Sequence, residues 1–264
     1  LKTTVTLPVR GPERLPMNIV LHRPNDSVAR PIFIDMYGGS WQRGTPHGAG
    51  RFHRLMASRG YAVFAIDYRH APEHRFPAQL DDVQAAIAFI EENAGRYYAD
   101  SKRVVLCGRS AGAHLALLAA YRPDSVPVNA VIAFYPPTDL AQGYDELPVP
   151  NPINVRYVLD QFLGGPPEKF PDAYRFASPS TYVRAGLPPT LLIHGGRDHV
   201  VKPEFSRAMH QRLVDAGNTS RLIEIPWAEH AFDAVWFGLG NRVAQPSIDS
   251  FLQTHAPAET KREP

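Results

Sequence analysis

Apolar runs alternate with helix-like patterns along most of this 264-residue chain, and this alternation constrains the fold more than any other feature. Residues 31–36 (PIFIDM) and 61–67 (YAVFAID) are almost continuously apolar, which is typical of strands buried on both faces of a parallel sheet. Further strand-like runs are residues 3–9, 17–22, 104–107, 130–134, 190–194 and 221–225, and the first two are expected to form a hairpin. Helix-like patterns are residues 51–59, 80–92, 111–121, 205–216 and 243–254. This order predicts an α/β fold with a mostly parallel central sheet of about eight strands flanked by helices.

Composition limits the classes of partner. Hydrophobic residues make up 44% of the chain and charged residues 20%, which is typical of a globular protein. The net charge is +2 with scattered basic residues, so we expect no nucleic acid partner. We also expect no membrane span in this chain, because no apolar run is long enough. Cys107, the only cysteine, is expected to be a buried thiol. A cytoplasmic location is expected, although a signal or anchor before Leu1 would change it.

Residues 141–185 interrupt the alternation and are rich in proline and aromatic residues. A long irregular connection within a compact domain is usually functional or disordered, and the aromatic residues argue against disorder. We therefore expect residues 1–264 to form a single domain in which residues 141–185 are a small cap or lid-like insertion. No feature demands an oligomer, although a homodimer is possible.

A serine lies between two glycines in VVLCGRSAGAHLALLAA, where a strand-like run meets a helix-like run. The G-x-S-x-G pattern in this context predicts a nucleophile elbow, a sharp turn that exposes Ser110. Gly108 and Gly112 would let the strand and the helix approach each other closely. Ser110 is therefore the candidate nucleophile.

Serine needs a base, and the base needs a group that orients it. Asp198 follows one predicted strand in LLIHGGRDHVV, and His230 follows the last one in IEIPWAEHAFD. The chain order Ser, Asp, His is that of α/β-hydrolases. Asp198 alone could be a helix N-cap, and His230 alone a surface histidine, but the combination predicts a catalytic triad. The other histidines considered, which are His114, His194 and His199, are expected to be structural or to point away from the site.

The glycine-rich stretch MYGGSWQRG follows the strand at residues 31–36. Backbone N–H groups in such a loop can stabilise the oxyanion that forms when serine attacks a carbonyl. The candidate donors are Gly38, Gly39 and Ser40, together with Ala111 at the start of the next helix. Trp41 is a candidate substrate-binding residue, and aromatic residues of 141–185 are expected to line the pocket with it.

These motifs resemble the α/β-hydrolase carboxylesterases, especially the hormone-sensitive-lipase-like branch. DYRHAPEHRFPAQLDDV (residues 67–83) is similar to that branch's D-Y-R-x-A-P-E-x-x-F-P-A-x-x-x-D signature, and GRSAGAHLA, GGRDHVV and EHAF are similar to its triad segments. The resemblance implies the α/β-hydrolase fold. It also implies hydrolysis of a small-molecule ester through an acyl-enzyme, with no metal and no cofactor. Its triad falls on Ser110, Asp198 and His230.

The chain departs from that branch at Tyr37, which stands where the family has histidine before its oxyanion loop. The loop YGGSWQRG also resembles those of feruloyl-esterase-like and kynurenine-formamidase-like hydrolases. A serine carboxylesterase acting on short-to-medium acyl esters is therefore the leading hypothesis. The alternatives are an arylformamidase or amide hydrolase with the same triad, a peptidase of the oligopeptidase type, and an inactive hydrolase-fold binding protein.

Overall fold

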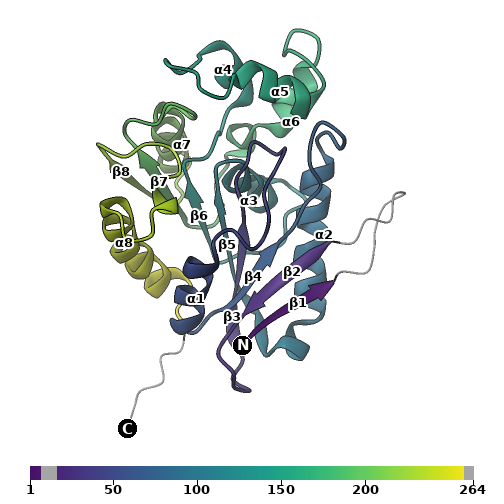
Figure 1. Cartoon of the computed structure of the whole chain (residues 1–264), viewed down its shortest axis with the longest axis vertical. Coiled ribbons are helices and arrows are strands. Elements are labelled where there is room, and N and C mark those ends of the chain that lie inside the picture. Colours follow the sequence, from purple (N-terminus) through teal and green to yellow (C-terminus); the bar gives the residue numbers. More distant parts are fainter. Residues whose placement is uncertain (7–16, 259–264) are drawn as a thin grey trace.

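A computed structural model describes residues 1–6 and 17–258. Its eight strands form one sheet in the order β1-β2-β4-β3-β5-β6-β7-β8 (Figure 1). They are β1 (Lys2–Thr6), β2 (Asn18–His22), β3 (Arg30–Met36), β4 (Ala62–Ile66), β5 (Ala99–Arg109), β6 (Ala130–Phe134), β7 (Thr190–Gly195) and β8 (Ser220–Ile225). β1 and β2 form the predicted hairpin, β2 pairs antiparallel with β4, and all the other neighbours are parallel. The predicted fold class is confirmed, while part of the first predicted run, residues 7–9, lies outside the described residues.

Helices cover both faces of the sheet. They are α1 (Gly50–Ser58), α2 (Ala78–Glu92), α3 (Ala111–Tyr121), α4 (Leu140–Asp145), α5 (Val155–Leu163), α6 (Pro171–Ala177), α7 (Glu204–Asp215) and α8 (Leu239–His255), with short 3₁₀ helices η1 (Ala94–Tyr97), η2 (Pro179–Tyr182) and η3 (Phe232–Ala234). α2, α3 and α7 contribute to the apolar cluster on one face, and α1 and α8 contribute to the cluster on the other. No helix in the described part of the chain is long and apolar enough to cross a membrane.

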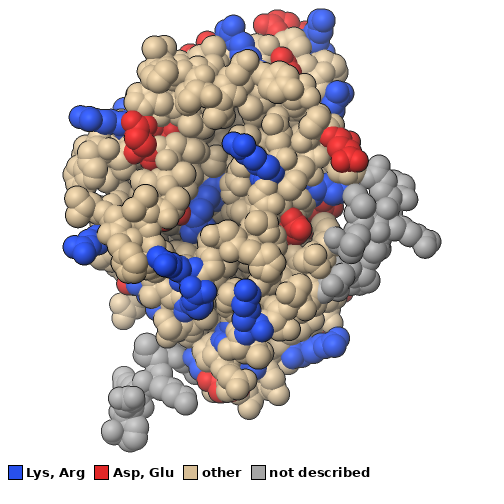
Figure 2. Space-filling model, in the orientation of Figure 1, with Lys and Arg blue, Asp and Glu red and all other residues tan. Residues whose placement is uncertain are grey.

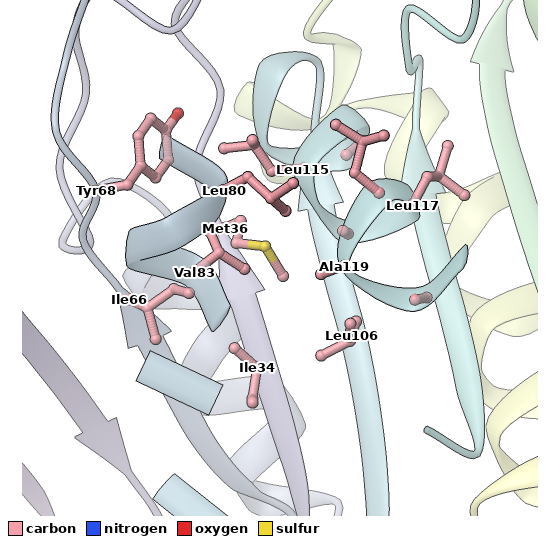
Figure 3. Packing of buried hydrophobic residues seen from close by; sticks show 14 of the residues in the cluster. Ile34, Met36, Ile66, Tyr68, Leu80, Val83, Leu106, Leu115, Leu117 and Ala119 are labelled. Carbon is pink, nitrogen blue, oxygen red and sulfur yellow. The ribbon is translucent and has the colours of Figure 1, made fainter. Parts of the chain in front are cut away.

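The core explains why β3 and β4 are apolar throughout. Every residue of both strands is buried, as expected for central strands covered on two faces. Figure 3 shows side chains of β3 and β5, including Ile34 and Leu106, packed against Val83 of α2 and Ala119 of α3. α3 is buried on all sides, so the helix that follows Ser110 is held rigidly.

Two segments differ from the sequence-based expectation. β5 starts at Ala99 rather than at residue 104, because its polar first half pairs with the start of β3 across a register shift between Pro31 and Ile32. Residues 141–185 are not irregular, since α5, α6, η2 and most of α4 lie within them. These short helices pack at the end of the molecule near α3, beyond the carboxyl ends of the parallel strands (Figure 1).

Candidate active site

Ser110 lies at a sharp turn between β5 and α3. Its φ of 52° and ψ of −118° are unfavourable for a residue with a side chain, and its backbone N–H is held by the Phe134 carbonyl at 2.9 Å. A Cβ at Gly108 would lie 2.3 Å from the Gly112 oxygen, and a Cβ at Gly112 would lie 2.2 Å from the Met36 oxygen. Only glycine fits at either position, so the two glycines allow this strained turn.

The structure brings Ser110, His230 and Asp198 together from three strand ends. The His230 Nε2 lies 3.0 Å from the Ser110 Oγ, and the His230 Nδ1 lies 2.6 Å from the Asp198 Oδ2. An ionised carboxylate accepts hydrogen bonds only, so Nδ1 carries the ring proton and Nε2 can accept the serine proton. The three side chains therefore form a hydrogen-bonded chain with the polarity that a nucleophilic serine requires.

Asp198 is buried, yet its surroundings keep it ionised. Burial by itself would raise the pKa of Asp198, but contacts with His194 and His230 hold that pKa below its usual value. The amides of Val200 and Val201 also donate to its Oδ1, both at 2.8 Å. The second oxygen, Oδ2, contacts His230 at 2.6 Å and also lies 3.2 Å from the His194 Nε2.

The two other histidines near Asp198 have different partners. His194 is buried in β7, where its ring nitrogens contact the Ser206 hydroxyl at 2.7 Å and the Val201 carbonyl at 2.9 Å. Its Nε2 also lies 3.2 Å from Asp198. His199 faces outward and pairs with Glu229 at 2.8 Å. Neither contacts Ser110, so His230 is the histidine that the geometry places against the serine.

The predicted oxyanion residues surround Ser110. Gly39 has a φ of 140° and Ser40 a φ of 57°, so the chain turns sharply after β3. Gly38 packs directly under the elbow, since a Cβ there would lie 2.7 Å from the Arg109 oxygen. Ala111 is the first residue of α3, and its N–H therefore has no partner within the helix.

Tyr37 anchors the oxyanion loop in place of the family's histidine. Its hydroxyl donates to the Asp67 carboxylate at 2.5 Å, and its ring stacks on Tyr68 with centroids 4.4 Å apart. The Tyr68 hydroxyl in turn donates to the Tyr37 carbonyl at 2.8 Å. The DYR segment thus braces the loop from behind, and Arg69 binds Asp82 of α2 at 2.9 Å.

Trp41 fixes the far end of this loop and is itself almost fully buried. Its ring stacks on Phe162 of α5 with centroids 4.2 Å apart, and its Nε1 donates to the His114 Nδ1 at 3.2 Å. The other ring nitrogen of His114 contacts the Ala177 carbonyl at 2.6 Å. His114 therefore joins the elbow helix, the oxyanion loop and the segment around α6.

A buried ionic network under the site was not predicted from the sequence. Arg109, the residue before Ser110, donates to Asp35 at 2.7 Å and to Asp233 at 2.5 Å. Burial alone would raise the pKa of Asp35, but Arg109 and His53 hold it well below the usual value. Tyr135 donates a short hydrogen bond to Asp233, and its ring centroid lies 4.5 Å from that of His230. A charged residue inside an apolar elbow was the one sequence signal of this network.

Two cavities meet at Ser110. The smaller has a volume of about 50 Å³ and is mostly apolar, with walls from Trp41, α4, α5 and the loops beside them. Its lining from the predicted cap is aliphatic, including Ile153 and Val158, and no aromatic residue of 141–185 contributes, so that expectation is wrong. The larger cavity, of about 750 Å³, lies on the side of His230 and reaches α1 and η3.

Comparisons with known proteins agree with this geometry. The BD-FAE family model matches residues 17–213. The probable carboxylic ester hydrolase LipM and the esterase LipQ, both from Mycobacterium tuberculosis (strain ATCC 25618 / H37Rv), are each 30% identical to this chain. Their alignments cover 77% and 88% of this chain but 49% and 58% of the relatives, so the chain spans about half the length of these curated proteins.

A solved structure gives the same result for the fold. The native esterase Est2 from the Planctomycetes species Thermogutta terrifontis matches with a TM-score of 0.81 and 25% identity, over 98% of this chain and 95% of that one. The matches confirm the resemblance to α/β-hydrolase carboxylesterases that the sequence motifs carry. The chain belongs to the BD-FAE family and has the α/β-hydrolase fold.

Proposed function

We propose that this chain is a serine carboxylesterase that hydrolyses short-chain acyl esters of small alcohols. The observation that carries the proposal is the hydrogen-bonded chain from the Ser110 Oγ through His230 to Asp198, at 3.0 Å and 2.6 Å. The names of the relatives support it, and a Thermogutta terrifontis esterase that is 25% identical is known in a form phosphonylated by sarin.

In the proposed mechanism, His230 takes the Ser110 proton as the serine oxygen attacks the ester carbonyl. The amides of Gly39, Ser40 and Ala111 stabilise the resulting oxyanion, and Gly38 holds the loop against the elbow. Asp198 stays ionised and stabilises the imidazolium. His230 then gives the proton to the leaving alcohol as the C–O bond breaks, and a water molecule hydrolyses the acyl-enzyme by the same steps.

The two cavities suggest where each half of the ester binds. The leaving oxygen must face the His230 Nε2, so the alcohol occupies the larger cavity, which His230 lines. The acyl group then enters the smaller cavity beside Ser40 and Ala111. The smaller cavity, of about 50 Å³, is much narrower than the larger one, of about 750 Å³, which favours a short acyl chain. In this proposal residues 141–185 act as a cap, because α5 and the loop before it form the apolar wall.

The test is hydrolysis of p-nitrophenyl esters from acetyl to palmitoyl by the wild type and by Ser110→Ala. We expect the highest kcat/KM at two to four carbons, a steep fall by eight, and loss of turnover in the variant. A fluorophosphonate probe should label the wild type but not Ser110→Ala. Absence of both turnover and labelling in folded protein would refute the proposal. Faster hydrolysis of formanilide than of phenyl acetate would instead indicate an amide hydrolase.

A further inference from the structure

The larger cavity beside Ser110 is strongly basic. Four arginines line it, which are Arg43 near the end of the glycine-rich loop after β3, Arg51 and Arg54 of α1, and Arg109 under the elbow. Asp233 is the only acidic residue among the described residues that line it. Figure 2 shows that blue side chains border a hollow near the middle of this face. Apart from these charges, the wall is made mainly of glycine, aromatic and small side chains.

Three of these guanidinium groups have no carboxylate partner in the described part of the chain, and one of them, Arg51, lies over the ring of Phe237, 5.3 Å from its centroid. Asp233 is already bound to Arg109, which also binds the buried Asp35. Arg43, Arg51 and Arg54 are exposed, and within residues 1–6 and 17–258 no carboxylate lies within 4.0 Å of their nitrogens.

The end of α1 adds to the positive potential. α1 begins at Gly50 in the wall of the cavity, with no side-chain cap and no acidic residue in its first turn. The partial positive charge of its free N–H groups therefore adds to that of Arg51 and Arg54. A cavity with walls of low dielectric concentrates such a field and raises the local concentration of anions.

We propose that this cavity is a binding site for an anionic group on the leaving alcohol, so that the preferred substrates are short-chain esters of alcohols or phenols that carry a carboxylate or a similar anion. The inference rests on the proposed function, because the chemistry of His230 places the leaving group in this cavity. Guanidinium groups form paired hydrogen bonds with planar oxyanions, which makes arginine well suited to such a group. Hydrolysis follows the same steps as for a neutral ester, with the proton of Ser110 passing through His230 to the leaving oxygen.

The test compares two substrates with the same acetyl group and the same ring, 3-acetoxybenzoate and its neutral counterpart 3-acetoxybenzamide. The readout is the ratio of their kcat/KM values in the full chain at low salt, after each value is divided by that compound's rate with hydroxide. We expect the wild-type ratio to be about ten to a hundred, from roughly two- to fivefold for each of the three arginines. Arg43→Gln, Arg51→Gln and Arg54→Gln should each lower the ratio by that factor, and 0.5 M NaCl should also lower it.

Arg96→Gln is the matched control. Arg96 is exposed in η1, just before β5 starts, and thus lies at the opposite edge of the parallel strands from Ser110. This variant should keep the wild-type ratio. The anion site would be overturned by a wild-type ratio of one or less, or by a wild-type ratio that persists in a variant with all three arginines changed to glutamine. Hydrolysis of the neutral ester in that case would still support the esterase. If folded protein turned over neither compound and resisted the fluorophosphonate probe, the proposed function and the anion site would both fall.

Discussion

His114 makes the stability of this protein dependent on pH in a way that can be calculated. An indole N–H can only donate, so the His114 Nδ1 accepts from Trp41 and Nε2 carries the ring proton toward the Ala177 carbonyl. The neutral ring is therefore satisfied on both sides. A second proton, on Nδ1, would face the indole N–H directly. Burial accordingly lowers the pKa of His114 from 6.5 to about 4.

The sign of the effect follows from proton binding. Between pH 6.5 and 4 the unfolded chain binds a proton at His114 that the folded chain excludes, so stability is lost as the pH falls through this range. The full difference in pKa corresponds to about 3 kcal/mol, and about 2 kcal/mol of it is lost between pH 7 and pH 5.

The assay is urea unfolding of the wild type, His114→Gln and His47→Gln at pH 7 and pH 5. Glutamine can still accept from Trp41 and donate to the carbonyl, but it does not titrate. The wild type should lose about 2 kcal/mol more on acidification than His114→Gln, whereas the exposed His47 control should behave as the wild type. The buried His22, whose pKa is also lowered to about 4, is present in all three proteins and cancels in the comparison. An equal loss in His114→Gln and wild type would refute the reasoning.

Other changes have separable outcomes. Gly112→Ala places a Cβ 2.2 Å from a backbone oxygen of β3, and the resulting displacement of the elbow should lower kcat/KM about a hundredfold. Gly95→Ala is the control, because nothing lies within 4 Å of a Cβ there, and it should leave kcat/KM unchanged. Steady-state kinetics check both variants. Asp198→Asn should lower kcat by about 10⁴-fold with the fold retained by circular dichroism, because the amide favours the wrong histidine tautomer. Tyr135→Phe removes a donor to the partly buried Asp233 and should lower the free energy of unfolding by about 1–3 kcal/mol, measured in urea.

The sequence predicts the sheet well because central parallel strands must be apolar on both faces. β3, β4 and β6 are buried throughout, and their apolar runs have no other explanation in a chain of this length. The polar start of β5 is invisible to this rule, since it is stabilised by pairing with the beginning of β3. The helices between residues 141 and 185 are hidden for another reason, because a proline such as Pro171 can stand in the first turn of a helix as well as in a loop.

Within the site, the triad residues were predictable because each one follows a strand, and parallel strands end at the same edge of the sheet. The network around Arg109 was not predictable. Arg109 is 74 residues from Asp35 and 124 from Asp233, and no periodicity or motif relates the three positions. Such a pairing becomes visible only once the strand order places β3 beside β5 and brings the loop after β8 back over the elbow.

The proposed reaction and the proposed substrate depend on residues from different parts of the fold. Ser110, Asp198 and His230 lie at strand ends, where the fold fixes them, so the proposed chemistry rests on their motifs. The walls of the two cavities come from other segments, the cap helix α5 on one side and the start of α1 on the other. Loops and helix ends can change without disturbing the sheet, so acyl length and the charge of the leaving group can vary independently. In the proposed anion site, Arg51 and Arg54 lie outside every motif quoted above, so those motifs do not indicate the charge of the leaving group.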